Sequence, residues 1–308
     1  MDAIILFFFM GMTCRILKVN LKLHNSLYEG LCLYLLLAIG LKGGAELSEH
    51  PPMAMIDDVL LVLLMGVLLP LIAFPLLRGL KLSRVNAASV AAHYGSVSIG
   101  TYAVAVGFLD ARGITFEGYM PLFVAILEVP AIMIGVALAN GRNAGQSGWP
   151  ALLHEVFFGK SVFLLLGSIL VGWIAGKEGL SQLAPFFVAP FKGVLAVFLL
   201  EMGIVAASHL RELKRYGKAI VGFGLVFPMI GAVLGALVAA VLGLSTGGAV
   251  LMMTLAASAS YIAAPAAMKM SVPDANPSLA LVASLGVTFP FNVLVGVPLY
   301  HYIATTFL

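Results

Sequence analysis

The stretch His93-Tyr-Gly-Ser-Val-Ser-Ile-Gly-Thr101 decides how the fold of this sequence is read. It lies inside a long apolar segment, yet its centre carries two glycines and three hydroxyl residues. Glycine costs about 1 kcal/mol relative to alanine inside a helix, and short hydroxyl side chains compete for backbone hydrogen bonds. A second apolar segment contains the similar stretch Ser258-Ala-Ser-Tyr-Ile-Ala-Ala-Pro265. Both stretches predict helices that are interrupted in the middle.

The composition places these interrupted helices in a membrane. Of the 308 residues, 61% are hydrophobic and 10% are charged, whereas soluble domains have about 45–50% apolar and about 25% charged residues. The net charge of +3 comes from scattered basic residues, which does not favour nucleic acid as a partner. Cys14 and Cys32 form no spacing typical of a disulfide framework or a metal site. Because no nucleophile–base pair or metal-ligand cluster is found either, we do not expect an enzyme.

Ten segments are candidate membrane spans, since a spanning helix needs about 20 mainly apolar residues. They are residues 2–17, 28–47, 56–80, 87–109, 119–140, 158–176, 188–208, 218–243, 248–270 and 279–305, all approximate. The first segment is the shortest, and we interpret it as a span and not as a cleaved leader. Asp2 stands where a signal peptide would carry basic residues.

The charges between the spans predict their orientation. Most of the 17 Lys and Arg residues lie in the loops that follow odd-numbered spans. The positive-inside rule places these loops in the cytoplasm. We therefore predict a multi-pass protein of the inner (plasma) membrane with both termini outside.

The two halves of the chain resemble each other. Four landmarks recur in the same order about 160 residues apart: Ser96 and Ser98 with Ser258 and Ser260, Pro130 with Pro290, Pro70 with Pro228, and Gly40 with Gly203. A repeat of this length contains five spans, and an odd number inverts the second copy in the membrane. The prediction is an all-α membrane protein, a single transmembrane domain of ten transmembrane helices. It is built as two inverted five-helix repeats, about 1–145 and about 155–308, with broken helices 4 and 9.

Two interrupted helices that meet inside a membrane offer binding groups for an anion and for a cation. Their helix N-termini favour an anion, while freed carbonyls and hydroxyls suit Na⁺. The candidate substrate-binding residues are Gly95, Ser96, Ser98, Gly100, Thr101, Ser258, Ser260 and Tyr261. The alternative is that small residues merely allow close helix packing, or that the serines bond back to the preceding turn. Matched positions in both repeats favour the binding site.

Glu128 lies near the middle of the fifth span, just before Pro130. A carboxylate at the bilayer centre costs about 2.5–3.5 kcal/mol on insertion scales, so Glu128 is a candidate for coupling an ion or accepting a proton. The alternative is a protonated interhelical contact. Glu201 in span 7 is likewise either an ion-coupling or proton-accepting group or a protonated interhelical contact. A third possibility is that it lies nearer the lipid headgroups. The candidate ion-coupling residues are Glu128, Ser98, Ser260, Thr288 and Asn292, the last two being oxygen donors near the repeat position of Glu128.

With these residues in hand, the chain resembles the sodium-dependent bicarbonate transporter family, the SbtA-like permeases. The matching pieces are IGLKGGAEL, YGSVSIGTYA, EVPAIMIG, ASASYIAAPAAMKMSVPDANPS and GVTFPFNVLVGVPLY. The resemblance implies a scaffold of helices 1, 2, 6 and 7 and a core of helices 3–5 and 8–10, with helices 4 and 9 crossing. It also implies a homotrimer in the lipid bilayer and regulation by a PII-like regulator.

Carried over by residue, the resemblance makes 95–101 and 258–261 the neighbourhood of substrate and sodium, and Glu128 takes the place of an acidic residue in span 5. The chain departs from the well-studied cyanobacterial members of the family at Ala257-Ser258-Ala259-Ser260-Tyr261, where they have a serine run followed by Asp, and at Ile99-Gly100, where they have Gly-Ser. The 141–157 loop is also shorter than the family's insertion. We predict a secondary active transporter for Na⁺-coupled uptake of bicarbonate or a similar small monoanion, without another cofactor. The alternatives are a proton-coupled small organic anion carrier and a non-transporting membrane anion sensor.

Overall fold

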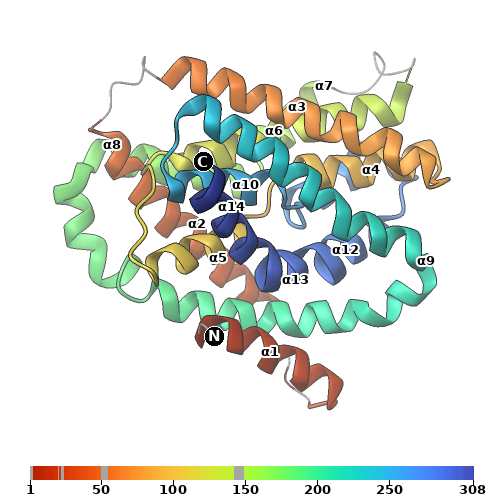
Figure 1. The fold of residues 1–308 in the computed structure, drawn as a ribbon, viewed down its shortest axis with the longest axis horizontal. Helices are drawn as coiled ribbons and strands as arrows, with labels where there is room; N and C mark the ends of the chain where they lie inside the picture. Colours follow the sequence, from red (N-terminus) through yellow and green to blue (C-terminus); the bar gives the residue numbers. More distant parts are fainter. Residues whose placement is uncertain (1–2, 20, 22–23, 50–54, 142–148) are drawn as a thin grey trace.

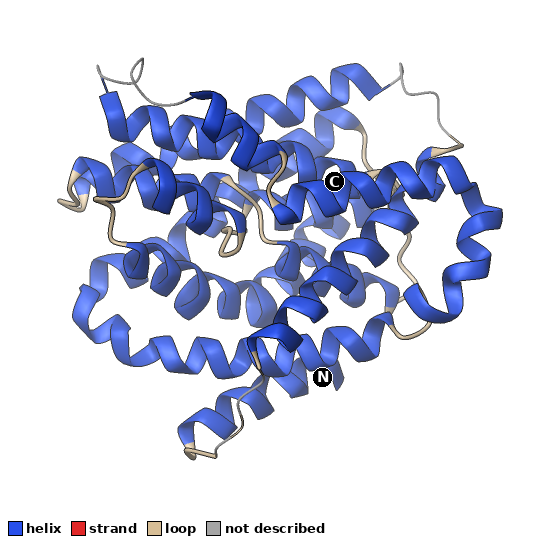
Figure 2. Ribbon diagram, turned by 180° about the vertical axis from the view of Figure 1, so that it is seen from behind, coloured by secondary structure: helices blue, strands red, loops and turns tan. Residues whose placement is uncertain are grey.

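The computed structural model describes residues 3–19, 21, 24–49, 55–141 and 149–308, and within these ranges it contains helices and no strand (Figures 1 and 2). This confirms the all-α prediction for the described chain. The elements are α1 (Ala3–Ile16), α2 (Asn25–Leu47), α3 (Ile56–Gly79), α4 (Arg84–Gly95), α5 (Ile99–Asp110), α6 (Met120–Asn140), α7 (Trp149–Phe157), α8 (Lys160–Phe187), α9 (Phe191–Leu242), α10 (Thr246–Ala256), α11 (Ala263–Ser271), α12 (Pro277–Ala283), η3 (Ser284–Thr288), α13 (Phe289–Phe291), η4 (Asn292–Gly296) and α14 (Val297–Phe307).

Seven helices within the described ranges are long and apolar enough to cross a membrane. Two of them are the halves of α9, which Gly217 divides with a φ of 79°. Gly176 bends α8 in the same way, with a φ of 63°. Glycine tolerates this left-handed backbone because it lacks a Cβ. The apolar helices α1 and α10 are shorter than a full span.

Helix α7 corrects the sequence interpretation, which treated residues 141–157 as a loop. The structure has a nine-residue helix at Trp149–Phe157. Its Leu152 is buried against Ile132 of α6 and Ala264 of α11. A search for long apolar spans overlooks such a helix, because a short amphipathic helix is stabilised by burying one face and not by overall hydrophobicity.

Helix α1 packs tightly along the first half of α9. A Cβ at Gly11 would collide with the carbonyl of Leu200, and a Cβ at Gly203 would collide with the carbonyl of Phe8. Small residues at such positions let two membrane helices bring their backbones together. Glycine on both sides therefore fixes this interface.

Helix α2 packs along α8 through a second contact of the same kind. A Cβ at Gly44 would collide with the carbonyl of Ile169, and a Cβ at Gly172 would collide with the carbonyl of Leu41. In both helix pairs, each helix contributes one glycine that meets a carbonyl of the other helix. The two interfaces thus have matching construction.

The C-terminal helical segment, 277–307, is widened on both sides of Pro290. The backbone N–H of Phe289 bonds the carbonyl of Ser284, and that of Val297 bonds the carbonyl of Asn292, which are π-helical bonds. Proline lacks an N–H and disturbs the regular α-helical ladder, and π-helical turns are frequent where such ladders are disturbed at functional positions. The widened segment packs beside the second half of α9.

Candidate functional site

The first interruption separates α4 from α5. Helix α4 ends at Gly95, the backbone of Ser96 and Ser98 is extended, and α5 begins at Ile99. Every residue of this segment is buried. The helix is therefore interrupted within the stretch where the sequence predicted it.

The second interruption separates α10 from α11. Helix α10 ends at Ala256 and α11 begins at Ala263. Pro265 lies in the first turn of α11, where the missing N–H of proline costs no helical hydrogen bond. The chain between the two helices contains Ser258 and Ser260, which are both buried.

The two interruptions contact each other directly. The backbone N–H of Ser98 donates to the Oγ of Ser258 over 2.9 Å, and the backbone N–H of Ser260 donates to the carbonyl of His93 over 2.7 Å. These groups would lack partners in lipid, where an unsatisfied backbone group is costly. The structure thus brings together the two stretches that the sequence singled out.

A serine stands at the start of each helix that leaves this crossing. The Oγ of Ser98 accepts a hydrogen bond from the backbone N–H of Thr101 at 3.1 Å and from the Thr101 hydroxyl at 2.9 Å. The Oγ of Ser260 accepts from the backbone N–H of Ala264 at 3.2 Å. The N-termini of α5 and α11, which are the positive ends of their helix dipoles, therefore both lie at the crossing. They favour a negative charge there.

Two buried hydroxyls lie at the crossing. The Oγ of Ser96 has no hydrogen-bond partner among the described residues, and the hydroxyl of Tyr261 lies close to the Ser98 side chain. The Tyr261 hydroxyl also lies against Gly100, and a Cβ at Gly100 would collide with it and with the Phe198 ring. Buried hydroxyls normally find a partner, so the Ser96 hydroxyl is available to a bound ion.

Glu128 on α6 is buried, and its Oε2 atom has no hydrogen-bond partner in the described chain. Helices α6 and α4 run antiparallel, because Gly135 meets Ala92 while Ala131 meets Gly95. One turn before Ala131, Glu128 is level with the interruption that follows Gly95. The packing therefore places Glu128 at the level of the crossing along α6.

Thr288 joins the last helical segment to the first interruption. Its Oγ1 donates to the carbonyl of Gly224 at 2.8 Å and lies 2.6 Å from the hydroxyl of Tyr94. Both bonds are buried. Thr288 thus holds the end of α4 in place, and its role as an ion ligand stays a prediction.

Asn292 joins the same segment to the second interruption. Its Nδ2 donates to the carbonyl of Ala257 at 2.9 Å, and its Oδ1 accepts from the hydroxyl of Tyr300 at 2.7 Å. These bonds satisfy a carbonyl freed at the end of α10. Asn292 therefore fixes the shape of the interruption, and ion coordination by its amide oxygen also stays a prediction.

Three further residues carry a buried polar atom without a partner in the described chain. His93 places Nδ1 2.7 Å from the Ser89 carbonyl and leaves Nε2 without a partner in the described chain. The Tyr102 hydroxyl, one turn into α5, is equally unpartnered. Glu201, near Phe198 on α9, has a buried Oε2 in the same condition. Tyr102 was missed from the sequence, although its spacing of four residues from Ser98 places both on one helix face.

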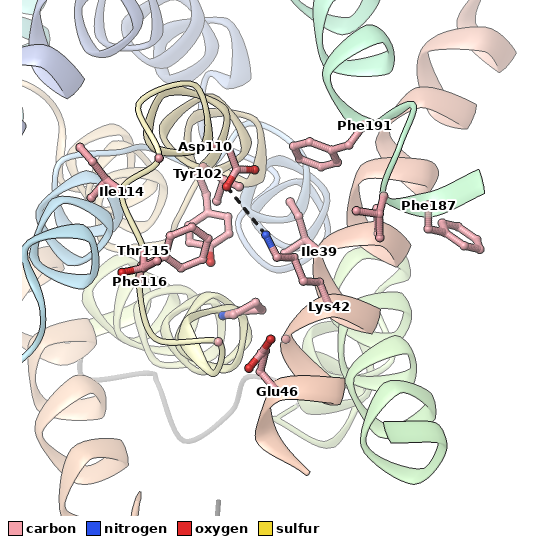
Figure 3. A pocket seen from close by; sticks show the side chains of 17 residues that line it. Ile39, Lys42, Glu46, Tyr102, Asp110, Ile114, Thr115, Phe116, Phe187 and Phe191 are labelled. Carbon is pink, nitrogen blue, oxygen red and sulfur yellow. Dashed lines mark ion pairs between the residues drawn. The ribbon is translucent and has the colours of Figure 1, made fainter. Parts of the chain in front are cut away.

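A cavity of about 440 Å³ has Tyr102 in its lining, one helical turn along α5 from Ser98 (Figure 3). It is lined by residues of α2, α5, the α5–α6 loop and the α8–α9 turn, including Ile39, Lys42, Glu46, Tyr102, Asp110, Phe116, Phe187 and Phe191. Lys42 Nζ lies 3.8 Å from Asp110 Oδ1, and it also lies 5.3 Å from the centre of the Phe116 ring. The cavity therefore combines both signs of charge with an aromatic wall.

A family model described as the Na⁺-dependent bicarbonate transporter superfamily matches residues 3–305. The matched region includes both interruptions, Glu128 and the cavity. A search of curated protein sequences finds no match.

Proposed function

We propose, from the premise that this chain belongs to the Na⁺-dependent bicarbonate transporter superfamily, that it is a secondary active transporter which takes up bicarbonate or a similar small monoanion together with Na⁺. The observation that carries this proposal is the buried contact between two interrupted helices, made by Ser98 with Ser258 and by Ser260 with His93. Secondary transporters bind substrate and coupling ion at such broken helices.

The proposed architecture is a pair of inverted repeats, about 1–145 and about 155–308. The matching glycine contacts support it: Gly11 on α1 corresponds to Gly172 on α8, and Gly203 on α9 corresponds to Gly44 on α2. Both correspondences have an offset of about 160 residues. This pairs Gly203 with Gly44, one turn beyond the sequence landmark Gly40. The scaffold would be α1, α2, α8 and the first half of α9, and the core would be the remaining helices.

In the proposed site, the anion lies at the N-termini of α5 and α11. The hydroxyls of Ser96 and Tyr261 would donate to its oxygens, and Gly100 leaves the space for Tyr261. Na⁺ is the second cargo, and hydroxyl and carbonyl oxygens of the interruptions suit it. Bound Na⁺ would favour the anion by charge, and Glu128 would favour Na⁺ in the same way.

A second candidate is a proton-coupled carrier of a small organic anion. It is favoured by the burial of Glu128 and by the absence of a partner for its Oε2 among the described residues. A homotrimer and a PII-like regulator are predictions from the family. The 142–148 segment, where the family's cytoplasmic insertion lies, falls outside the described residues.

Uptake of labelled bicarbonate by proteoliposomes tests the proposal. An inward Na⁺ gradient at constant pH should drive accumulation, and an equal K⁺ gradient should not. Accumulation driven by a pH gradient without Na⁺ would favour the proton-coupled carrier. Saturable bicarbonate binding without any flux would favour the membrane sensor.

A further inference from the structure

The cavity reaches one helical turn from the crossing of the two interruptions. Tyr102 lines it, and the backbone N–H of Tyr102 bonds the carbonyl of Ser98, the residue that begins the crossing on this side. The Tyr102 side chain is only 1% exposed, and its hydroxyl has no partner in the described chain. Tyr102 therefore adds a buried hydroxyl without a partner in the described chain to the cavity wall, one helical turn from Ser98.

The charged residues of the cavity suit a pair of ions of opposite sign. Lys42 supplies an ammonium, while Glu46 and Asp110 supply carboxylates. The Lys42 and Asp110 side chains are 44% and 31% exposed, so both are reachable by small ions. Figure 3 shows them pointing toward each other across the cavity.

The Lys42–Asp110 pair is also poised to separate. Asp110 ends α5, and a carboxylate is disfavoured at a helix C-terminus. Lys42 offsets this cost, although their 3.8 Å separation is long for a hydrogen-bonded pair. When the pair separates, an anion would take the place of Asp110 beside Lys42. A cation would take the place of Lys42 beside Asp110.

A smaller cavity lies elsewhere along the boundary between the proposed scaffold and core. It measures about 140 Å³, and its lining includes Lys160 and Ser161 of α8, Ile132 of α6, and Ile262, Ala263, Ala266 and Ala267 around the start of α11. Lys160 bonds Glu29 at the opposite end of α2 from Lys42. The two cavities thus approach the interrupted helices from opposite ends of α2.

We propose that the 440 Å³ cavity is the access vestibule for the cargo ions, with Tyr102 as its inner wall and the Lys42–Asp110 pair as a charge-selective gate. Lys42 recruits the small anion, and Asp110 with Glu46 recruits the cation. This inference rests on the proposed transport function for its cargo, but the vestibule itself is testable without transport.

Thiol labelling tests the vestibule in reconstituted full-length protein. Cys14 and Cys32 are replaced by alanine, and Thr115→Cys, in the cavity wall, is labelled with membrane-impermeant thiosulfonates of either charge. In this background, Lys42→Gln should slow the anionic reagent at least fivefold and should leave the cationic reagent unchanged or faster, because the cavity loses a positive charge. Lys269→Gln, which removes an exposed cation that does not line the cavity, is the matched control. Failure of Thr115→Cys to react, or equal slowing of both reagents, would overturn the vestibule.

Transport kinetics supply the second measurement. Lys42→Gln should raise the KM for bicarbonate at least fivefold and change kcat less than twofold, because access is impaired while the crossing is intact. Asp110→Asn should raise the Na⁺ concentration for half-maximal uptake. Charge-selective labelling in a protein that does not transport bicarbonate would refute the proposed cargo and leave the vestibule standing. An unchanged KM in an active Lys42→Gln protein would refute the gate.

Discussion

The backbone N–H of Ser98 donates to the Oγ of Ser258, 160 positions later in the chain, over a buried distance of 2.9 Å. Ser258 in turn donates its hydroxyl proton to the carbonyl of Leu255 at 2.9 Å. The serine therefore connects the end of α10 to the start of α5. One hydroxyl fixes how the two interrupted helices face each other.

Ser258→Ala should destabilise the protein and impair uptake. It leaves the buried N–H of Ser98 without an acceptor, which costs about 1–3 kcal/mol. We expect a lower midpoint of thermal unfolding in detergent and bicarbonate uptake reduced about tenfold or more, a change of about 1.4 kcal/mol in barrier height. Ser181→Ala, which removes an exposed hydroxyl bonded to the Glu178 carbonyl, is the control and should resemble wild type. Wild-type uptake by Ser258→Ala would contradict the role of this contact.

Gly100→Ala should disturb the crossing by overfilling it. Its Cβ would collide with the Tyr261 hydroxyl and the Phe198 ring, and overpacking costs about 1–3 kcal/mol. In a Tyr261→Phe background the penalty on unfolding should fall by about 1 kcal/mol, because contacting residues couple. Chemical unfolding of the four variants measures this coupling.

The control for this cycle is Gly222→Ala, since a Cβ at Gly222 has no neighbour within 4 Å. It should leave stability unchanged or slightly raised, because alanine favours a helix more than glycine does. Additive effects of Gly100→Ala and Tyr261→Phe would show that the two residues do not touch in the protein.

Glu128→Gln separates the two coupling ions. In the proposed symporter, losing the carboxylate should raise the Na⁺ concentration for half-maximal uptake about tenfold, equivalent to about 1.4 kcal/mol, while glutamine keeps the side chain's volume. In the proton-coupled carrier, the same change should abolish uptake driven by a pH gradient. Uptake measured against Na⁺ concentration at fixed pH distinguishes them, with exposed Glu178→Gln as the control. An unaltered Na⁺ dependence would remove Glu128 from the coupling site.

Gly11→Ala and Gly172→Ala should destabilise the protein to a similar extent. Each Cβ would collide with a carbonyl of the facing helix, and such overpacking costs about 1–3 kcal/mol. Thermal unfolding of the two variants tests the proposed repeat. Gly30→Ala and Gly167→Ala, with no neighbour within 4 Å of the added Cβ, should be neutral. A large cost at only one of the two contact positions would argue against equivalent interfaces.

Much of the fold follows from local sequence patterns. The apolar segments predicted membrane helices, and the clustered glycine, serine and proline residues predicted the interruptions at 93–101 and 258–265. These features depend on hydrophobicity and backbone preference within a few residues, so no distant contact is needed to infer them. Helix α7 escaped this logic because its nine residues gain stability from packing against α6 and α11.

The sequence by itself determined that this is a membrane protein with two interrupted helices and a buried carboxylate at Glu128. Only the tertiary structure decided which polar side chains have hydrogen-bond partners and which have none among the described residues. The sequence predicts Thr288 and Asn292 as ion ligands, which stays a prediction, and the structure adds their bonds to Tyr94 and Ala257 at the two interruptions. The Lys42–Asp110 pair likewise joins residues that are close only after folding. Hydrogen-bond partners and cavities depend on how distant helices pack, and that packing is not encoded in any short stretch of residues.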